Sequence, residues 1–66
     1  MAGNTRGKLK EHFEGVHRNF DWSTKHLIIA QQLIKERNPK LTSGIKSLAE
    51  GIEMLDKLAM EIYARL

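Results

Sequence analysis

The 66-residue sequence predicts an all-α fold, an antiparallel two-helix hairpin whose copies assemble into a helical-bundle homo-oligomer. Two series of mostly apolar residues recur at alternating gaps of four and three residues. This average spacing is typical of packed helices, and no strand produces it. A short polar segment containing the one proline separates the series. Without cysteine, a domain of this size has no disulfides, so we expect self-association to supply the missing stability.

The first helix is expected to span about residues 5–37, with Asn4 or Thr5 as its N-cap and residues 1–4 as a frayed start. Its apolar series predicts the face that packs on the second helix. The members are Leu9, Phe13, Val16, Phe20, Ser23, Leu27, Ala30 and Ile34. Poor helix formers around residues 20–23 raise the alternative of a kink. The series keeps its phase there, which favours a continuous helix.

The second helix is expected to span about residues 39–64. Asn38 and Pro39 are typical of a helix start, because proline at the first helical position loses no hydrogen bond. A start at Thr42 or Ser43 is the alternative. The second apolar series consists of Leu41, Ile45, Leu48, Ile52, Leu55, Ala59, Ile62 and Leu66. We interpret residues 1–66 as a single helical-hairpin domain.

Both helices carry more apolar residues than one contact uses. The additional ones are Trp22, His26, Ile29 and Leu33 on the first helix, and Met54 and Leu58 on the second. Gly44 and Gly51 lie beside the latter. A glycine within a helix costs about 1 kcal/mol, so the pair indicates either the close approach of another backbone or room for a ligand. The simplest interpretation of the additional stripes is the interface of a dimeric four-helix bundle.

No constellation of residues predicts catalysis or a metal site. Glu50, Glu53 and Asp56 are similar to the acidic helices that hold magnesium in all-α nucleotide pyrophosphatases, but we expect these carboxylates to point away from the packed face. Glu14-x-x-His17 matches only half of a di-iron motif. No two histidines have the i,i+4 spacing of a helical two-histidine site. We therefore predict a non-enzyme without cofactor or metal ligands.

Binding is indicated by one aromatic residue and a set of cations. Trp22, flanked by Arg18 and Lys25, can stack a base while the cations hold phosphate. The alternative is that Trp22 anchors a protein interface and the cations lie at its rim. A net charge of only +3 argues against extended DNA as a partner. The candidate ligand-binding residues are Arg18, Trp22, Lys25, His26, Lys40, Lys46, Ser47 and Gly51.

Residues 38–58 resemble part of a phage-encoded family of small all-helical proteins, the anti-CBASS sponges that sequester cyclic oligonucleotides. The matching positions are Asn38, Pro39, Leu41, Leu48, Glu50, Gly51 and Leu55. The chain departs from the family at Lys40, where the family has an aromatic residue, at Lys46-Ser47, where it has a Thr-His pair, and at Lys57, where it has arginine. The resemblance implies a homo-oligomer whose intersubunit pockets trap a cyclic nucleotide, or another small anionic ligand, without cleaving it.

Three functions stay open. The first is this nucleotide sponge, a phage counter-defence protein. It alone accounts together for the paired glycines, the tryptophan and the basic turn region, which carries Lys35, Arg37, Lys40 and Lys46 against Glu36 alone. The second is a protein-interaction or inhibitor module that contacts a protein target. Its contact surface would consist of Trp22, Ile29, Leu33, Met54 and Leu58. The third is an RNA-binding four-helix-bundle dimer, similar in length and layout to a plasmid copy-control protein that grips RNA loop pairs, which is an analogy of fold alone.

The cellular location is predicted from two absences. The longest apolar run, residues 27–30, is too short to span a bilayer. The polar N-terminus has no signal-peptide pattern. We expect a cytoplasmic protein with no membrane partner.

Overall fold

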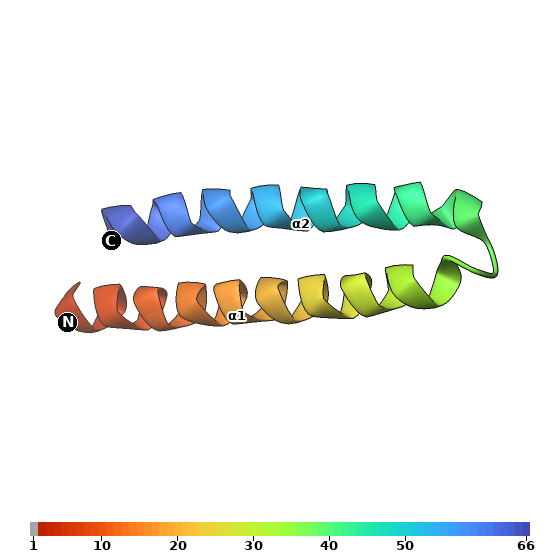
Figure 1. Ribbon diagram of the computed structural model, residues 1–66. Helices are drawn as coiled ribbons and strands as arrows, with labels where there is room; N and C mark the ends of the chain where they lie inside the picture. Colours follow the sequence, from red (N-terminus) through yellow and green to blue (C-terminus); the bar gives the residue numbers. More distant parts are fainter. Residues whose placement is uncertain (1) are drawn as a thin grey trace.

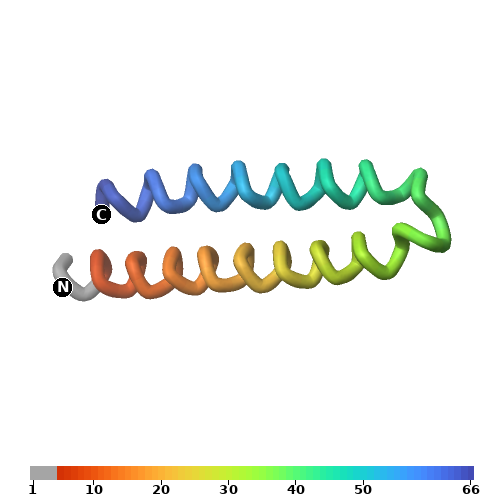
Figure 2. The backbone as a smooth tube through the Cα atoms, in the orientation of Figure 1, coloured from red at the N-terminus to blue at the C-terminus, as the bar shows by residue number. Residues whose placement is uncertain are grey.

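The computed structural model describes the backbone of residues 2–66 and the side chains of residues 5–66. The chain forms two helices, α1 (Ala2–Ile34) and α2 (Pro39–Arg65), joined by a short turn (Figure 1). The helices run antiparallel and side by side over their length (Figure 2). The predicted all-α hairpin is therefore confirmed. Neither helix, within the residues described, has an apolar stretch long enough to cross a membrane.

The turn begins earlier than expected, because α1 ends at Ile34 rather than near residue 37. The backbone amides of Arg37 and Asn38 both donate to the Ile34 carbonyl, at 3.0 and 2.8 Å, and this closes the helix. Asn38 has a non-helical backbone (φ −148°, ψ 79°), as the steric demands of a following proline require. Pro39 occupies the first turn of α2 as predicted, although the Asn38 side chain makes no capping hydrogen bond.

Other predicted helix boundaries also differ from the structure. α1 begins at Ala2, so the expected N-cap at Asn4 or Thr5 is wrong. Of the predicted frayed residues 1–4, Met1 lies outside the described residues, and fraying of the rest stays a prediction. A start of α2 at Thr42 or Ser43 is also wrong, since both residues lie inside the helix.

α1 continues without a break through residues 20–23, as the phase of its apolar series predicted. The Thr24 hydroxyl lies within this stretch and donates to the Phe20 carbonyl at 3.0 Å. The hydroxyl is therefore satisfied inside the helix. A threonine that bonds back to the carbonyl four residues earlier tends to bend a helix slightly rather than to end it.

The helices meet along two rows of residues, here called the inner rows, in which gaps of three and four residues alternate. The inner row of α2, whose members are part-covered or buried, is Thr42, Ile45, Ala49, Ile52, Asp56, Ala59, Tyr63 and Leu66. The inner row of α1 is Lys10, Phe13, His17, Phe20, Thr24, Leu27, Gln31 and Ile34. Polar and apolar positions alternate along the α1 row, so α1 brings only a half-apolar row to the contact.

Half of each predicted apolar series is therefore not in the contact. Six of the large apolar side chains that we expected there lie one residue before an inner-row position, and they are 37–55% exposed. These residues are Leu9, Val16, Leu41, Leu48, Leu55 and Ile62. We call the direction in which a helix's apolar side chains point on average its apolar centre. The periodicity identified this direction correctly for each helix, but the line along which the helices touch is rotated away from it.

The hairpin is a rod with very little interior. Among the described residues only Ala59 is buried, with 8% of its surface exposed. The accessible surface is 5587 Å², whereas a compact protein of 7.6 kDa exposes about 4,300 Å². The radius of gyration of 15.7 Å likewise exceeds the value of about 11 Å for a compact chain of this length. A single copy thus leaves most of its apolar side chains in water.

Candidate binding surfaces

The inner rows divide the hairpin into two broad faces. Successive residues of a helix are rotated by about 100°, so the residues before and after an inner-row position lie on opposite sides of the contact. Because the two helices run in opposite directions, their successive residues rotate in opposite senses when both helices are viewed from the same end of the hairpin. The residues that precede inner-row positions therefore share one face on both helices, and those that follow share the other.

The face formed by the preceding residues is mostly apolar, and we call it the apolar face. Its large apolar side chains are Leu9, Val16, Leu33, Leu41, Leu48, Leu55, Leu58 and Ile62, of which each is 37–72% exposed. Its polar residues are His12, Asn19, Ser23, His26 and Arg65. Gly44 and Gly51 lie on the same face of α2, and neither would meet another atom within 4 Å if it carried a Cβ. Nothing in the chain itself therefore explains why these two positions are small.

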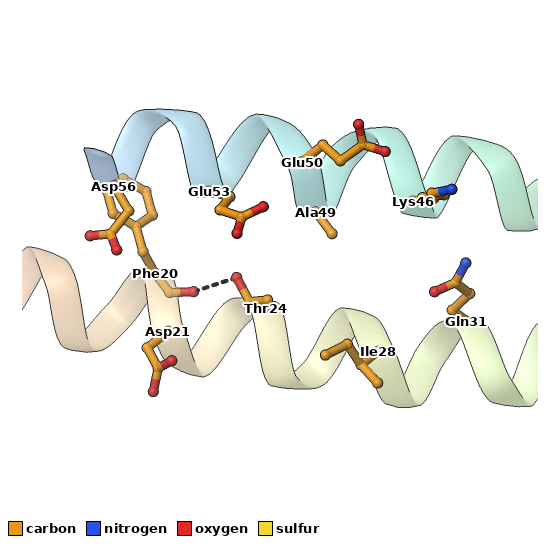
Figure 3. A pocket seen from close by; sticks show the side chains of 10 residues that line it. All are labelled: Phe20, Asp21, Thr24, Ile28, Gln31, Lys46, Ala49, Glu50, Glu53 and Asp56. Carbon is orange, nitrogen blue, oxygen red and sulfur yellow. Dashed lines mark hydrogen bonds between the residues drawn. The ribbon is translucent and has the colours of Figure 1, made fainter. Parts of the chain in front are cut away.

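The opposite face is charged, and it contains a groove between the helices of about 420 Å³ (Figure 3). The lining residues are Phe20, Asp21, Thr24, Ile28, Gln31, Lys46, Ala49, Glu50, Glu53 and Asp56. Four carboxylates and one ammonium group line the groove; Asp21 is paired with Lys25 and Asp56 with His17, which leaves Glu50 and Glu53 beside Lys46. The small side chains of Thr24 and Ala49 leave room between the helices. The local field favours cations and repels an anion.

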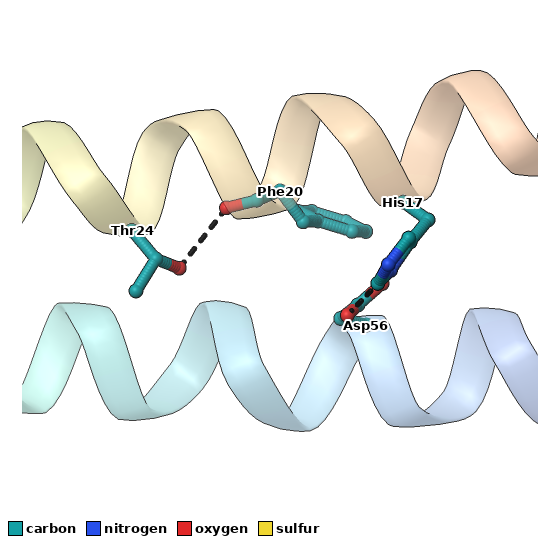
Figure 4. A network of polar contacts seen from close by, with 4 residues as sticks. All are labelled: His17, Phe20, Thr24 and Asp56. Atoms are coloured by element: carbon teal, nitrogen blue, oxygen red, sulfur yellow. Dashed lines mark hydrogen bonds and ion pairs between the residues drawn. The ribbon is translucent and has the colours of Figure 1, made fainter.

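One of these carboxylates joins the two helices. The Nδ1 atom of His17 lies 2.8 and 2.9 Å from the two carboxylate oxygens of Asp56 (Figure 4). Because a carboxylate only accepts, His17 must donate from Nδ1. The Asp56 side chain is 23% exposed, so the expectation that it points away from the packed face is wrong. Asp56 occupies an inner-row position of α2, and its partner His17 lies on α1.

A second cross-helix cluster lies near the end opposite the turn. The Tyr63 hydroxyl donates to Glu14 Oε2 at 2.7 Å, and the Lys10 ammonium lies 5.9 Å from the centre of the Tyr63 ring. The hydrogen bond to Glu14 raises the pKa of Tyr63 above its usual value of 10.0, and partial burial and the Glu14 charge add to this effect. Arg6 Nε also contacts the Leu66 carbonyl, so the two helix ends are tied together.

The predicted ligand-binding residues are distributed over three surfaces. Trp22 lies on the outer edge of α1, opposite the contact, and His26 lies beside it on the apolar face. Their rings are 5.3 Å apart at 87°, an edge-on arrangement. Arg18 and Lys25 lie across the border on the charged face, where Lys25 pairs with Asp21 at 3.2 Å. These four predicted residues form one neighbourhood, which we call the Trp22 patch.

The other four predicted residues lie away from the Trp22 patch. Lys40 and Ser47 occupy the outer edge of α2, on the far side of the hairpin from Trp22. Gly51 lies on the apolar face. Lys46 lines the acidic groove, where its neighbours include Glu50 and Glu53. One chain therefore does not bring the eight predicted residues into one pocket.

Sequence reasoning missed the acidic groove, His17 and Tyr63 as cross-helix features. No local motif marks them, since each depends on how residues far apart in sequence are aligned. The available signal was the fold-back itself, because pairing Phe13 with the region of Tyr63 brings His17 near Asp56. Among the residues that the structure describes, no three histidine, aspartate or glutamate side chains are grouped so that they could hold a metal ion.

Comparisons of the chain with protein-family models, curated proteins and solved structures give no match.

Proposed function

We propose that this chain is a non-enzymatic cytoplasmic binding protein that sequesters a small anionic nucleotide in pockets formed between its subunits. The observation that supports the proposal is the Trp22 patch. Trp22 is 62% exposed and its ring lies edge-on to His26, with Arg18 and Lys25 four and three residues away. An exposed ring bordered by cations is a surface on which a base stacks while phosphate is neutralised.

The acidic groove bears on where such a ligand would bind. Its four carboxylates disfavour an anion between the two helices of one hairpin. Lys40 and Ser47 lie on the opposite outer edge and can complete a Trp22 pocket only when they come from another copy. The proposal therefore requires a homo-oligomer, as the resemblance to the sponge family also implies.

A thermal-shift measurement with a panel of cyclic dinucleotides and trinucleotides tests the proposal. A ligand that binds only the folded state at 100 times its dissociation constant adds about 2.7 kcal/mol of stability. We expect a clear rise in the unfolding midpoint for at least one nucleotide, and we expect Trp22→Ala to abolish that rise. Recovery of the nucleotide unchanged after incubation would support sequestration, and its hydrolysis would contradict the non-enzymatic assignment.

A protein-interaction module is the second candidate, and the exposure of its whole predicted contact surface favours it; these residues are Trp22, Ile29, Leu33, Met54 and Leu58. A contiguous exposed apolar surface is typical of protein interfaces. If no nucleotide shifts the unfolding midpoint, this candidate takes precedence. An RNA-binding dimer would be distinguished from both candidates by the salt dependence of its RNA affinity, because binding through phosphate contacts weakens steeply as salt is added.

A further inference from the structure

The apolar centre of each helix is rotated away from the neighbouring helix by a definite angle. The predicted apolar series and the inner row share every second member, such as Phe20 and Ile52, and differ by one residue at the others. Leu48, for example, replaces Ala49, and Leu55 replaces Asp56. One residue is a rotation of about 100°, so the two directions differ on average by about 50°. Both helices are rotated toward the same face.

This angle is characteristic of helices in a four-helix bundle. In a square arrangement, the bundle centre lies about 45° from the direction of each of a helix's two neighbours. A helix that belonged only to a two-helix pair would instead direct its apolar centre at its single partner. Each helix of this chain is therefore patterned for two neighbours, and one chain supplies only one of them.

We infer that a second copy of this chain docks on the apolar face, so that two hairpins pack face to face as a four-helix bundle with a two-fold axis. This inference rests on the self-association part of the proposed function and specifies the surface that it uses. The interface centres on Leu48 and Leu55 rather than on the outer-edge residues Trp22, Ile29 and Met54.

The size of the apolar face fits this occupant. The Cα envelope measures 54 × 15 × 10 Å, so the broad face has a projected area on the order of the 800 Å² that each partner buries in a standard interface. A short peptide or a small ligand would cover only part of this length. A second hairpin has the same length and the same apolar surface, and it satisfies the self-complementarity that a two-fold interface demands.

The glycines of α2 provide a second argument. Along the apolar face, large and small side chains alternate in the order Leu41, Gly44, Leu48, Gly51 and Leu55. The space above both glycines is open within the chain. Small residues at a helix contact allow closer backbone approach and receive large side chains from the partner. The glycines thus have a role in the bundle that they lack in the single hairpin.

The charged face is a poor alternative for the same occupant. Pairing two copies through it would remove from water the many charged side chains of both copies, among them Arg18, Glu50 and Glu53. Buried charges are costly unless each finds a partner in good geometry. The charge distribution therefore directs the second copy to the apolar face, and it leaves the charged face in solvent.

The test is sedimentation equilibrium of the full chain and of two matched lysine variants. Leu48 on the apolar face is 55% exposed, and Ile28 on the charged face is 49% exposed. In a two-fold dimer, Leu48→Lys places one lysine from each copy in the interface. We therefore expect the dimer dissociation constant to rise by about 100-fold. Ile28→Lys places a cation among the groove carboxylates, and we expect it to leave the dissociation constant within about threefold of the original value. Equal effects of the two variants would overturn the inference.

A measurement on the unaltered chain guards against a variant that fails to fold. In a mixture of ¹³C-labelled and unlabelled chains, isotope-filtered NOEs arise only between subunits. We expect them at the methyl groups of Leu48 and Leu55 and not at Ile28. A monomer at NMR concentrations, or intersubunit NOEs confined to Ile28 or to the outer edges, would overturn the inference.

The nucleotide function and the dimer through the apolar face can be disproved independently of each other. The nucleotide experiment reads ligand-induced stability and needs no knowledge of which face is covered. A dimer through the apolar face without a nucleotide response would retain the inference and remove the nucleotide function. A nucleotide response from an assembly whose NOEs avoid Leu48 and Leu55 would do the reverse.

Discussion

Thr42 carries a buried hydroxyl oxygen without a hydrogen-bond partner, the one such side-chain atom among the described residues. It lies on the inner row near the turn, where Gln31 and Ile28 border the same hollow. Thr24, by contrast, has a hydroxyl that donates to the Phe20 carbonyl. The two threonines are both part-covered, so they form a natural pair for measuring what an unsatisfied hydroxyl costs.

We predict that Thr42→Val stabilises the protein by about 1 kcal/mol, because it removes an unsatisfied polar atom without changing the side-chain shape. In a chain of this size, that corresponds to a rise of about 4–8 °C in the unfolding midpoint. Thr24→Val gives up a hydrogen bond that is already made, so we expect no gain from it. Circular dichroism melts at equal chain concentration measure both, and equal shifts would contradict the explanation.

Because of the Tyr63 hydrogen bond, we predict that the folded chain loses stability in alkaline solution. The pKa of Tyr63 is raised in the folded chain by the hydrogen bond to Glu14, so folding favours the protonated phenol. The contribution is complete below the unfolded-state pKa of about 10, and it disappears as the pH rises through the higher folded-state value. We expect the unfolding midpoint of the original chain to fall more steeply with rising pH than that of Tyr63→Phe. The difference should appear between about pH 9 and pH 11, around the pKa of a tyrosine. Parallel pH profiles would show that Tyr63 does not contribute.

At the scale of the helix, glycines distinguish the single hairpin from its assembly. A Cβ at Gly15 on the outer edge of α1 would meet only the Arg18 guanidinium, at 3.7 Å, and a Cβ at Gly51 on α2 would meet nothing. Within one chain, alanine should therefore improve both helices equally, by about 1 kcal/mol each. Any difference between the two positions must come from outside the chain.

We predict that Gly15→Ala raises the unfolding midpoint and that Gly51→Ala does not, because a partner approaches Gly51 in the dimer. Melts at high and low chain concentration provide the control, since dilution to monomer should restore the gain from Gly51→Ala. Identical gains at every concentration would indicate that no backbone comes close to Gly51.

For the whole molecule, the exposed apolar face makes stability depend on the amount of protein present. Folding of a dimer is second order in chain, so a tenfold rise in concentration adds about 1.4 kcal/mol of dimer stability. We expect the unfolding midpoint to rise by several degrees between dilute and tenfold more concentrated samples. Superimposable melting curves across that range would mean that the hairpin folds alone.

The sequence was sufficient to predict the two helices and the turn, and insufficient to predict how the helices face each other. A spacing of three and four residues identifies the apolar centre of a helix, and Asn38-Pro39 marks a helix start by local sterics. The spacing does not say how many neighbours share that centre. The register was therefore predicted one residue off at Leu48 and Leu55, which are exposed, in place of Ala49 and Asp56.

The candidate site was predictable only where its members lie on one helix. Arg18, Trp22, Lys25 and His26 fall within nine residues of α1, so helical spacing alone groups them. Lys46 was grouped with them by charge, but it lines the groove on the other helix, where Glu50 and Glu53 follow it on α2. The His17–Asp56 pair depends on the alignment of two helices, which no pattern within either helix encodes.

The position of Trp22 gives the protein a built-in optical probe. It is the one tryptophan of the chain, and it lies on the border between the charged and apolar faces with 62% of its surface in water. Indole fluorescence shifts to shorter wavelength when water is excluded. The wavelength of maximum tryptophan emission from an unmodified sample therefore reports whether a ligand or partner covers the outer edge of α1 at Trp22.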